Sequence, residues 1–202
     1  MLYFVIKFVM NFKLQNVYPS WFLISVGFVT ASVTSVAMNA RPIGKAMFYL
    51  GFILYFIMLP IVIYRMVKIK PLPEPTRPTI AIFTAPMSLC IAGYMAAFEE
   101  PNIIFIFIML TIAVVSYIYV TVNMVFLIRL KFYPTYVAFT FPYVISAIAF
   151  KSANALLVKN GYGFFSFAPI VSEWIAVIIV AYVLVRYVLF LVSAPLSIKK
   201  AG

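Results

Sequence analysis

Six long apolar stretches dominate the chain and limit what it can fold into. They cover residues 21–38, 46–66, 80–98, 103–128, 136–157 and 172–192. A helix needs about 20 apolar residues to cross the hydrocarbon core of a bilayer. The strands of a membrane barrel are about half as long and alternate in polarity, which these stretches do not. The sequence therefore predicts an all-α polytopic membrane protein, with a single membrane domain over residues 1–202.

The scarcity of ionisable side chains excludes most catalytic and metal chemistry. The 202 residues include no histidine, one cysteine and four acidic residues, and 66% of them are hydrophobic. The usual ligands of zinc and haem, and the bases of hydrolytic triads, are therefore missing. We expect neither an enzyme nor a cofactor-binding protein. We also expect no nucleic-acid partner, because the lipid bilayer accounts for the formal net charge of +11 through the loop bias described next.

Lysine and arginine concentrate in alternate loops. They precede the first span, separate the second from the third and the fourth from the fifth, and follow the sixth. Cytoplasmic loops of membrane proteins carry such an excess. We therefore expect a multi-pass protein of the plasma membrane with both termini in the cytoplasm. Glu99 and Glu100 would then lie at the outer mouth, where they oppose the entry of anions.

Residues 1–14 form a shorter apolar stretch that Lys7 and Lys13 interrupt. A signal peptide begins with basic residues, whereas here the charges come after the apolar residues have started. We interpret residues 1–14 as the remnant of a preceding membrane helix.

The six spans alternate in their content of small residues. The first, third and fifth are rich in Gly, Ala, Ser and Thr, whereas the second, fourth and sixth consist mainly of bulky side chains. Small residues let helix backbones approach closely, and bulky residues suit contact with lipid. The sequence therefore predicts three tandem hairpins, each with an inner helix followed by an outer, lipid-facing helix. This repeat is one of physical character rather than of letters.

The small residues of each inner helix fall on one stripe. Such stripes either pack helices together or also line a central path. The predicted pore-lining residues are Thr30, Thr34, Thr84, Ser88, Ser146 and Ser152. Pro86 and Pro142 lie inside the third and fifth spans, where we expect each to kink its helix and free the carbonyl of Ile82 or Ala138.

Two cationic residues lie within the apolar spans. Lys151 is well inside the fifth span, where it either faces a cavity and attracts anions or extends its ammonium group to the outer interface. Arg186 lies toward the cytoplasmic end of the sixth span and fits an interfacial anchor.

Three runs of the sequence resemble a known family. They are Val17-Tyr18-Pro19-Ser20-Trp21 followed by Val26-Gly27, the run from Ala85-Pro86-Met87-Ser88 to Gly93-Tyr94, and Phe139-Thr140-Phe141-Pro142. In this order they resemble the fifth, seventh and ninth helices of the tellurite-resistance/dicarboxylate transporter family, which includes plant slow-type anion channels and the yeast malate permease.

The resemblance implies a ten-helix fold of five hairpins whose inner helices surround a pore, assembled as a homotrimer with one pore per protomer. Only the last six helices have counterparts here, so the chain corresponds to the C-terminal part of that fold. A missing N-terminal four-helix segment would have to be supplied in addition. The resemblance further implies a pore obstructed by a phenylalanine of the ninth helix, to which Phe141 corresponds, with Phe139 as the alternative.

The function that these features predict is transport of small anions, inorganic ions or C4-dicarboxylates, by a channel or uniporter. A proton-coupled dicarboxylate carrier is a second hypothesis, for which Lys151 is the one titratable relay inside the spans. The third is a non-conducting structural or regulatory subunit that completes a pore with another chain. A truncated chain without activity belongs to the same group of alternatives.

Overall fold

Helical hairpins make up the whole of the described structure. The computed structural model describes residues 13–69 and 72–198, and that part contains helices without strands. The α-helices are α2 (Phe22–Thr34), α3 (Arg41–Lys68), α4 (Ala85–Ala97), α5 (Ile103–Leu127), α6 (Thr140–Lys159) and α7 (Phe167–Ile198). Four 3-10 segments precede or join them: η2 (Leu14–Asn16), η3 (Pro19–Trp21), η4 (Glu74–Thr84) and η5 (Pro134–Phe139). The predicted all-α membrane fold is confirmed, whereas residues 1–12 of the predicted helix remnant lie outside the described residues.

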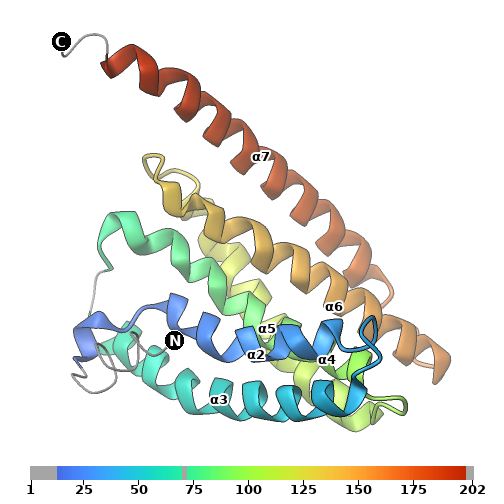
Figure 1. The fold of residues 1–202 in the computed structure, drawn as a ribbon. Coiled ribbons are helices and arrows are strands. Elements are labelled where there is room, and N and C mark those ends of the chain that lie inside the picture. Colours follow the sequence, from blue (N-terminus) through green and yellow to red (C-terminus); the bar gives the residue numbers. More distant parts are fainter. Residues whose placement is uncertain (1–12, 70–71, 199–202) are drawn as a thin grey trace.

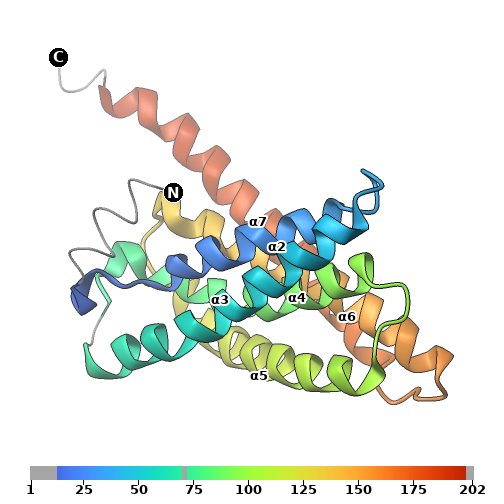
Figure 2. The same cartoon turned by 60° about the horizontal axis from the view of Figure 1, so that its bottom comes forward.

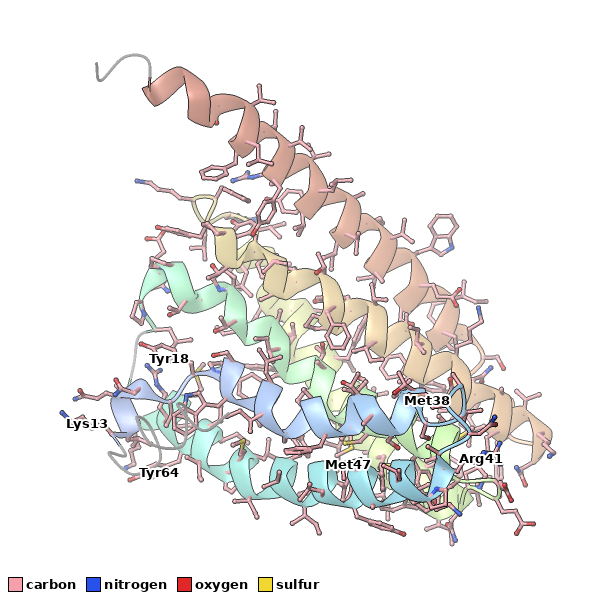
Figure 3. The ribbon with its side chains drawn as sticks, viewed as in Figure 1. Lys13, Tyr18, Met38, Arg41, Met47 and Tyr64 are labelled. Atoms are coloured by element: carbon pink, nitrogen blue, oxygen red, sulfur yellow. The ribbon has the colours of Figure 1, made fainter. Side chains whose placement is uncertain are left out.

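The hairpins pack side by side through their inner helices. α2 contacts α3, α4 contacts α5 and α6 contacts α7, while α4 also lies against both α2 and α6. Figures 1 and 2 show α2 and α3 as an antiparallel pair, with α7 at the opposite edge diverging from the bundle toward its C-terminal end. Lys13, Tyr18 and Tyr64 lie at one end of the α2–α3 pair, and Met38 and Arg41 lie at the other (Figure 3).

Burial separates inner from outer helices as predicted. In the most apolar part of each span, 78% of residues are buried in Glu74–Ala97 and 50% in Pro134–Lys159. The corresponding shares are 22% in α3, 33% in α5 and 17% in α7. Helix α2 differs from the other inner helices because the small residues of its stripe, from Gly27 to Thr34, are exposed. The inner wall is therefore open along α2.

The first span is shorter than the sequence predicted. Within the described residues, five helices are long enough to cross a bilayer, and the helical run from Pro19 to Thr34 is not among them. The chain leaves the helix in a turn over residues 35–39, and Asn39 adopts φ 50°. Asparagine tolerates this left-handed conformation better than most residues, which lets the chain reverse into α3. The prediction of six membrane-long spans is thus wrong for the first.

The prolines of the inner helices mark a change of winding, not a break. Pro86 and Pro142 stand in the first turn of α4 and α6, directly after the 3-10 segments η4 and η5. The Ile82 carbonyl, predicted to be free, accepts the backbone N–H of Ala85. A 3-10 turn pairs residues three apart, so it supplies a donor that lies before the proline. The expected kink at Pro86 is therefore replaced by a continuous helix that changes pitch.

The three inner helices also share a repeat of letters, contrary to the sequence-based prediction. Each contains, in or before its first turns, a proline, a hydroxyl residue directly after it, a second hydroxyl residue six positions after the proline, and Gly or Pro eight positions after it. The matching sets are Pro19, Ser20, Ser25 and Gly27; Pro78, Thr79, Thr84 and Pro86; and Pro134, Thr135, Thr140 and Pro142. Because 3-10 winding is present in each set, the repeat specifies how an inner helix starts.

Candidate functional site: a vestibule where the inner helices begin

A cavity of about 360 Å³ lies where the three inner helices begin. We call it the vestibule. It is lined by Ser20, Leu23, Thr79, Ile82, Ala85, Thr135, Val137, Ala138, Phe141 and Pro142. The lining comes from η3 and α2, from η4 and α4, and from η5 and α6, so all three hairpins contribute to it.

Equivalent positions of the letter repeat meet in the vestibule. The residues after the first proline, Ser20, Thr79 and Thr135, all line it. The residues three positions later, Leu23, Ile82 and Ala138, line it as well. Ser20, Thr79 and Thr135 were not among the residues predicted to line a path, although their shared spacing after a proline is the signal that identifies them.

Phe141 is the aromatic side chain of the vestibule. Its side chain is 47% exposed although it lies between helices, because it borders this cavity. The alternative residue, Phe139, is fully buried and packs on Tyr136 with ring centroids 4.9 Å apart. Of the two phenylalanines, Phe141 therefore borders the vestibule and Phe139 does not, while the obstruction of a path stays a prediction.

Two threonines that line the vestibule donate hydrogen bonds to backbone carbonyls, one between η5 and η4 and one within η4. The hydroxyl of Thr135 in η5 donates to the Pro75 carbonyl of η4 at 2.6 Å. The Thr79 hydroxyl donates to the Thr76 carbonyl at 2.6 Å. These two hydroxyl protons are therefore engaged by the backbone and are not free to bind an anion.

A further hydrogen bond joins the start of η4 to the residue that precedes η5. The Tyr133 phenol donates to the Glu74 carboxylate at 3.1 Å. Partial removal of water from the ring and the negative charge of Glu74 raise the pKa of Tyr133. The phenol therefore remains a hydrogen-bond donor at neutral pH, and Glu74 is partnered by it.

Three of the predicted pore-lining residues meet between α4 and α6. Ser88 and Ser146 are fully buried with their Oγ atoms 3.0 Å apart, and Thr84 is fully buried beside them. The Ser88 hydroxyl lies 2.7 Å from the Thr84 carbonyl oxygen, and that of Ser146 lies 2.8 Å from the Pro142 carbonyl oxygen and 3.4 Å from that of Thr84. In this arrangement the hydroxyls join two helices, and a pore-lining role for them stays a prediction.

The Ser88–Ser146 contact makes a prediction for stability. Replacing either serine with alanine is expected to lower the free energy of unfolding by about 1 kcal/mol, because each change removes the same hydroxyl–hydroxyl bond. The double variant should lose less unfolding free energy than the two single variants lose together, and the difference, which is the coupling energy of the two serines, should be about 0.5 kcal/mol or more. Thermal unfolding of the detergent-solubilised chain measures this. Ser152→Ala serves as the control, because the Ser152 hydroxyl bonds only within its own helix.

The other predicted lining residues lie elsewhere on the inner helices. Thr30 and Thr34 are exposed on the open face of α2, and their hydroxyls donate to carbonyls of the same helix. Ser152 is half-buried and lines a second cavity of about 770 Å³ between α6 and α7. Of the six predicted pore-lining residues, three are therefore buried between α4 and α6, two are exposed on α2, and one lines the groove between α6 and α7.

The predicted anion-attracting charge is neutralised by a partner. The Lys151 ammonium lies 2.7 Å from the Glu173 carboxylate of α7, and both residues line the groove between α6 and α7. Neither lines the vestibule. Where α3 begins, Arg41 forms an ion pair with Glu99, so this glutamate opposes anions less than its bare charge suggests.

The described structure is that of a polytopic membrane protein in which three hairpins meet at one cavity. The profile of the voltage-dependent anion channel family matches residues 1–188, and the chain belongs to this family. No curated protein and no solved structure matches the chain. Family membership confirms the resemblance seen in the sequence and places the chain among proteins that carry anions across membranes, rather than among enzymes.

Proposed function

We propose that the chain forms part of a passive path for small anions, inorganic ions or C4-dicarboxylates, which Phe141 obstructs at the vestibule. The observation that carries this proposal is the exposed Phe141 side chain in a cavity that equivalent positions of three hairpins surround. The formal net charge of +11 favours anions over cations near the protein. A proton relay has less support, since the Lys151 ammonium is held by Glu173.

Further helices complete the path along α2. A Cβ atom added to Gly27 would meet nothing within 4 Å, and Thr30 and Thr34 are exposed on the same face. Small residues on a membrane helix favour contact with another helix rather than with lipid. We propose that a four-helix segment covers this face, either as part of the same protein or from another chain, within a homotrimer of the plasma membrane whose termini are cytoplasmic.

Flux through reconstituted vesicles tests the proposal. Vesicles that contain the protein should release chloride, nitrate or malate faster than empty vesicles, with no dependence on a pH gradient. Gly27→Trp should reduce this flux about fivefold, because the ring would occupy the path beside α2. Ala46→Trp is the matched control, since Ala46 is exposed on the outer helix α3.

The outcomes separate the alternatives. Flux that requires a pH gradient would favour a proton-coupled carrier over a passive path. Flux that appears only when a separate four-helix partner is added would assign the chain to a subunit that does not conduct alone. Equal effects of Gly27→Trp and Ala46→Trp would contradict a path along α2.

A further inference from the structure

An arginine in an aromatic cage lies in the C-terminal half of the outer helix α7. The guanidinium carbon of Arg186 is 5.7 Å from the ring centroids of Phe132 and Tyr136 and 5.8 Å from that of Tyr182. Three aromatic faces around one cation are more than an isolated interfacial anchor requires, because a single ring already gives a favourable contact. We call Arg186 with these three rings the arginine cage.

The two tyrosines of the cage are fixed by hydrogen bonds of their own. The Tyr136 hydroxyl donates to the carbonyls of Leu127 and Leu130, at 3.2 and 2.8 Å. The Tyr182 hydroxyl donates to the carbonyl of Ile128 at 3.1 Å. These bonds hold the tyrosines against the chain where it leaves α5, at carbonyls of the last helical residue and of the turn that follows it; the Leu127 carbonyl also accepts the backbone N–H of Leu130. The cage is therefore built into the junction of α5, η5 and α7 and holds the guanidinium in a defined place.

The guanidinium itself lacks an anion. Among the described residues no hydrogen bond or ion pair reaches Arg186, and the side chain is half-buried. Its N–H groups are not among the buried polar atoms that lack a partner, so they face the surface. A guanidinium presents five donors in a planar fork that fits two oxygens of a carboxylate or phosphate.

Within the described residues, none of the acidic side chains pairs with Arg186. There are four: Glu99 pairs with Arg41 and Glu173 with Lys151, whereas Glu74 accepts a hydrogen bond from Tyr133 and lies close enough to the cage for its charge to act on Tyr136. Glu100 lies in the loop between α4 and α5, at the opposite end of the molecule from the end of α5 (Figure 1). An anion that pairs with Arg186 must therefore come from outside the chain's own side chains.

The surroundings of the cage indicate which anion this is. The cage adjoins the loop that contains Arg129 and Lys131, both exposed, on the side that the basic loops predict to be cytoplasmic. Basic pockets at this level between membrane helices bind the head groups of anionic lipids. We propose that the arginine cage binds the phosphate of an anionic phospholipid of the cytoplasmic leaflet, with Arg129 and Lys131 adding electrostatic attraction.

Lipid binding to the full chain in detergent micelles tests this proposal. Native mass spectrometry would measure dissociation constants for phosphatidylglycerol and phosphatidylcholine. The wild-type chain should prefer phosphatidylglycerol, and Arg186→Gln should weaken its binding about tenfold. Arg186→Lys should lie between them, because lysine keeps the charge but loses the planar fork.

A matched variant and a competitor make the result decisive. Lys68→Gln removes one cation that lies over a single ring, that of Tyr64, at 5.9 Å, and should change the affinity less than about twofold. Equal losses in Arg186→Gln and Lys68→Gln, or no preference of the wild type for the anionic lipid, would overturn the proposal. Displacement of the lipid by excess inorganic phosphate would assign the cage to a free anion instead. If Arg186→Gln does not fold, an affinity of Arg186→Lys equal to that of the wild type overturns the proposal.

Discussion

Replacing Phe141 with alanine is expected to increase anion flux through reconstituted vesicles about tenfold or more. The ring borders the vestibule and is 47% exposed, so its removal widens the cavity without taking a side chain from the core. A barrier that falls by about 1.4 kcal/mol is enough for a tenfold rise in rate. The measurement is the initial rate of chloride or nitrate release at equal amounts of incorporated protein.

Two further phenylalanines serve as controls for this result. Phe126→Ala removes a ring that is 66% exposed on the outer helix α5 and should leave the flux unchanged. Phe139→Ala removes a fully buried ring and should reduce stability by about 3 kcal/mol without a comparable rise in flux. A rise in flux with Phe139→Ala and none with Phe141→Ala would transfer the obstruction to Phe139.

Hairpin architecture could be predicted because lipid selects bulky side chains and helix contacts select small ones. That contrast separates α4 and α6 from α3, α5 and α7 in the sequence and again in their burial. It also assigns α2 to the inner helices, but it does not reveal that the small face of α2 is open. Small residues allow another helix to pack closely against α2. Whether such a helix is present depends on the assembly, which the sizes of the residues do not reveal.

The details of the site were harder to predict because they depend on winding and pairing. Pro86 was expected to free a carbonyl, yet the 3-10 turn before it supplies the N–H of Ala85. Ser88 and Ser146 were expected to face a path, and their hydroxyls lie 3.0 Å from each other. A hydroxyl on a stripe can bond to its own helix, to a neighbouring helix or to a solute, and periodicity alone does not distinguish these partners.

The close contact of α2 with α3 and α4 should be the point where the fold tolerates least change. A Cβ atom at Gly51 would lie 2.4 Å from Val29 Cγ2 and 2.8 Å from the backbone oxygen of Ser25. A Cβ atom at Gly93 would lie 2.8 Å from Val29 Cγ1 on the other side. The fully buried Val29 is thus held between glycines of two helices, and the backbones approach as closely as those side chains allow.

Gly51→Leu is therefore expected to destabilise the protein by about 3 kcal/mol or more, because a rigid backbone atom stands where the new side chain begins. Gly27→Leu makes the same chemical change on the open face of α2, where nothing of this chain lies within 4 Å, and should leave the unfolding temperature unchanged when the chain is measured without a covering segment. Val29→Ala added to Gly51→Leu should restore only part of the loss, since the Ser25 carbonyl oxygen remains in place. Equal unfolding temperatures for Gly51→Leu and Gly27→Leu would mean that α2 and α3 do not pack at this distance, and the wall that positions the vestibule would then have to be built differently.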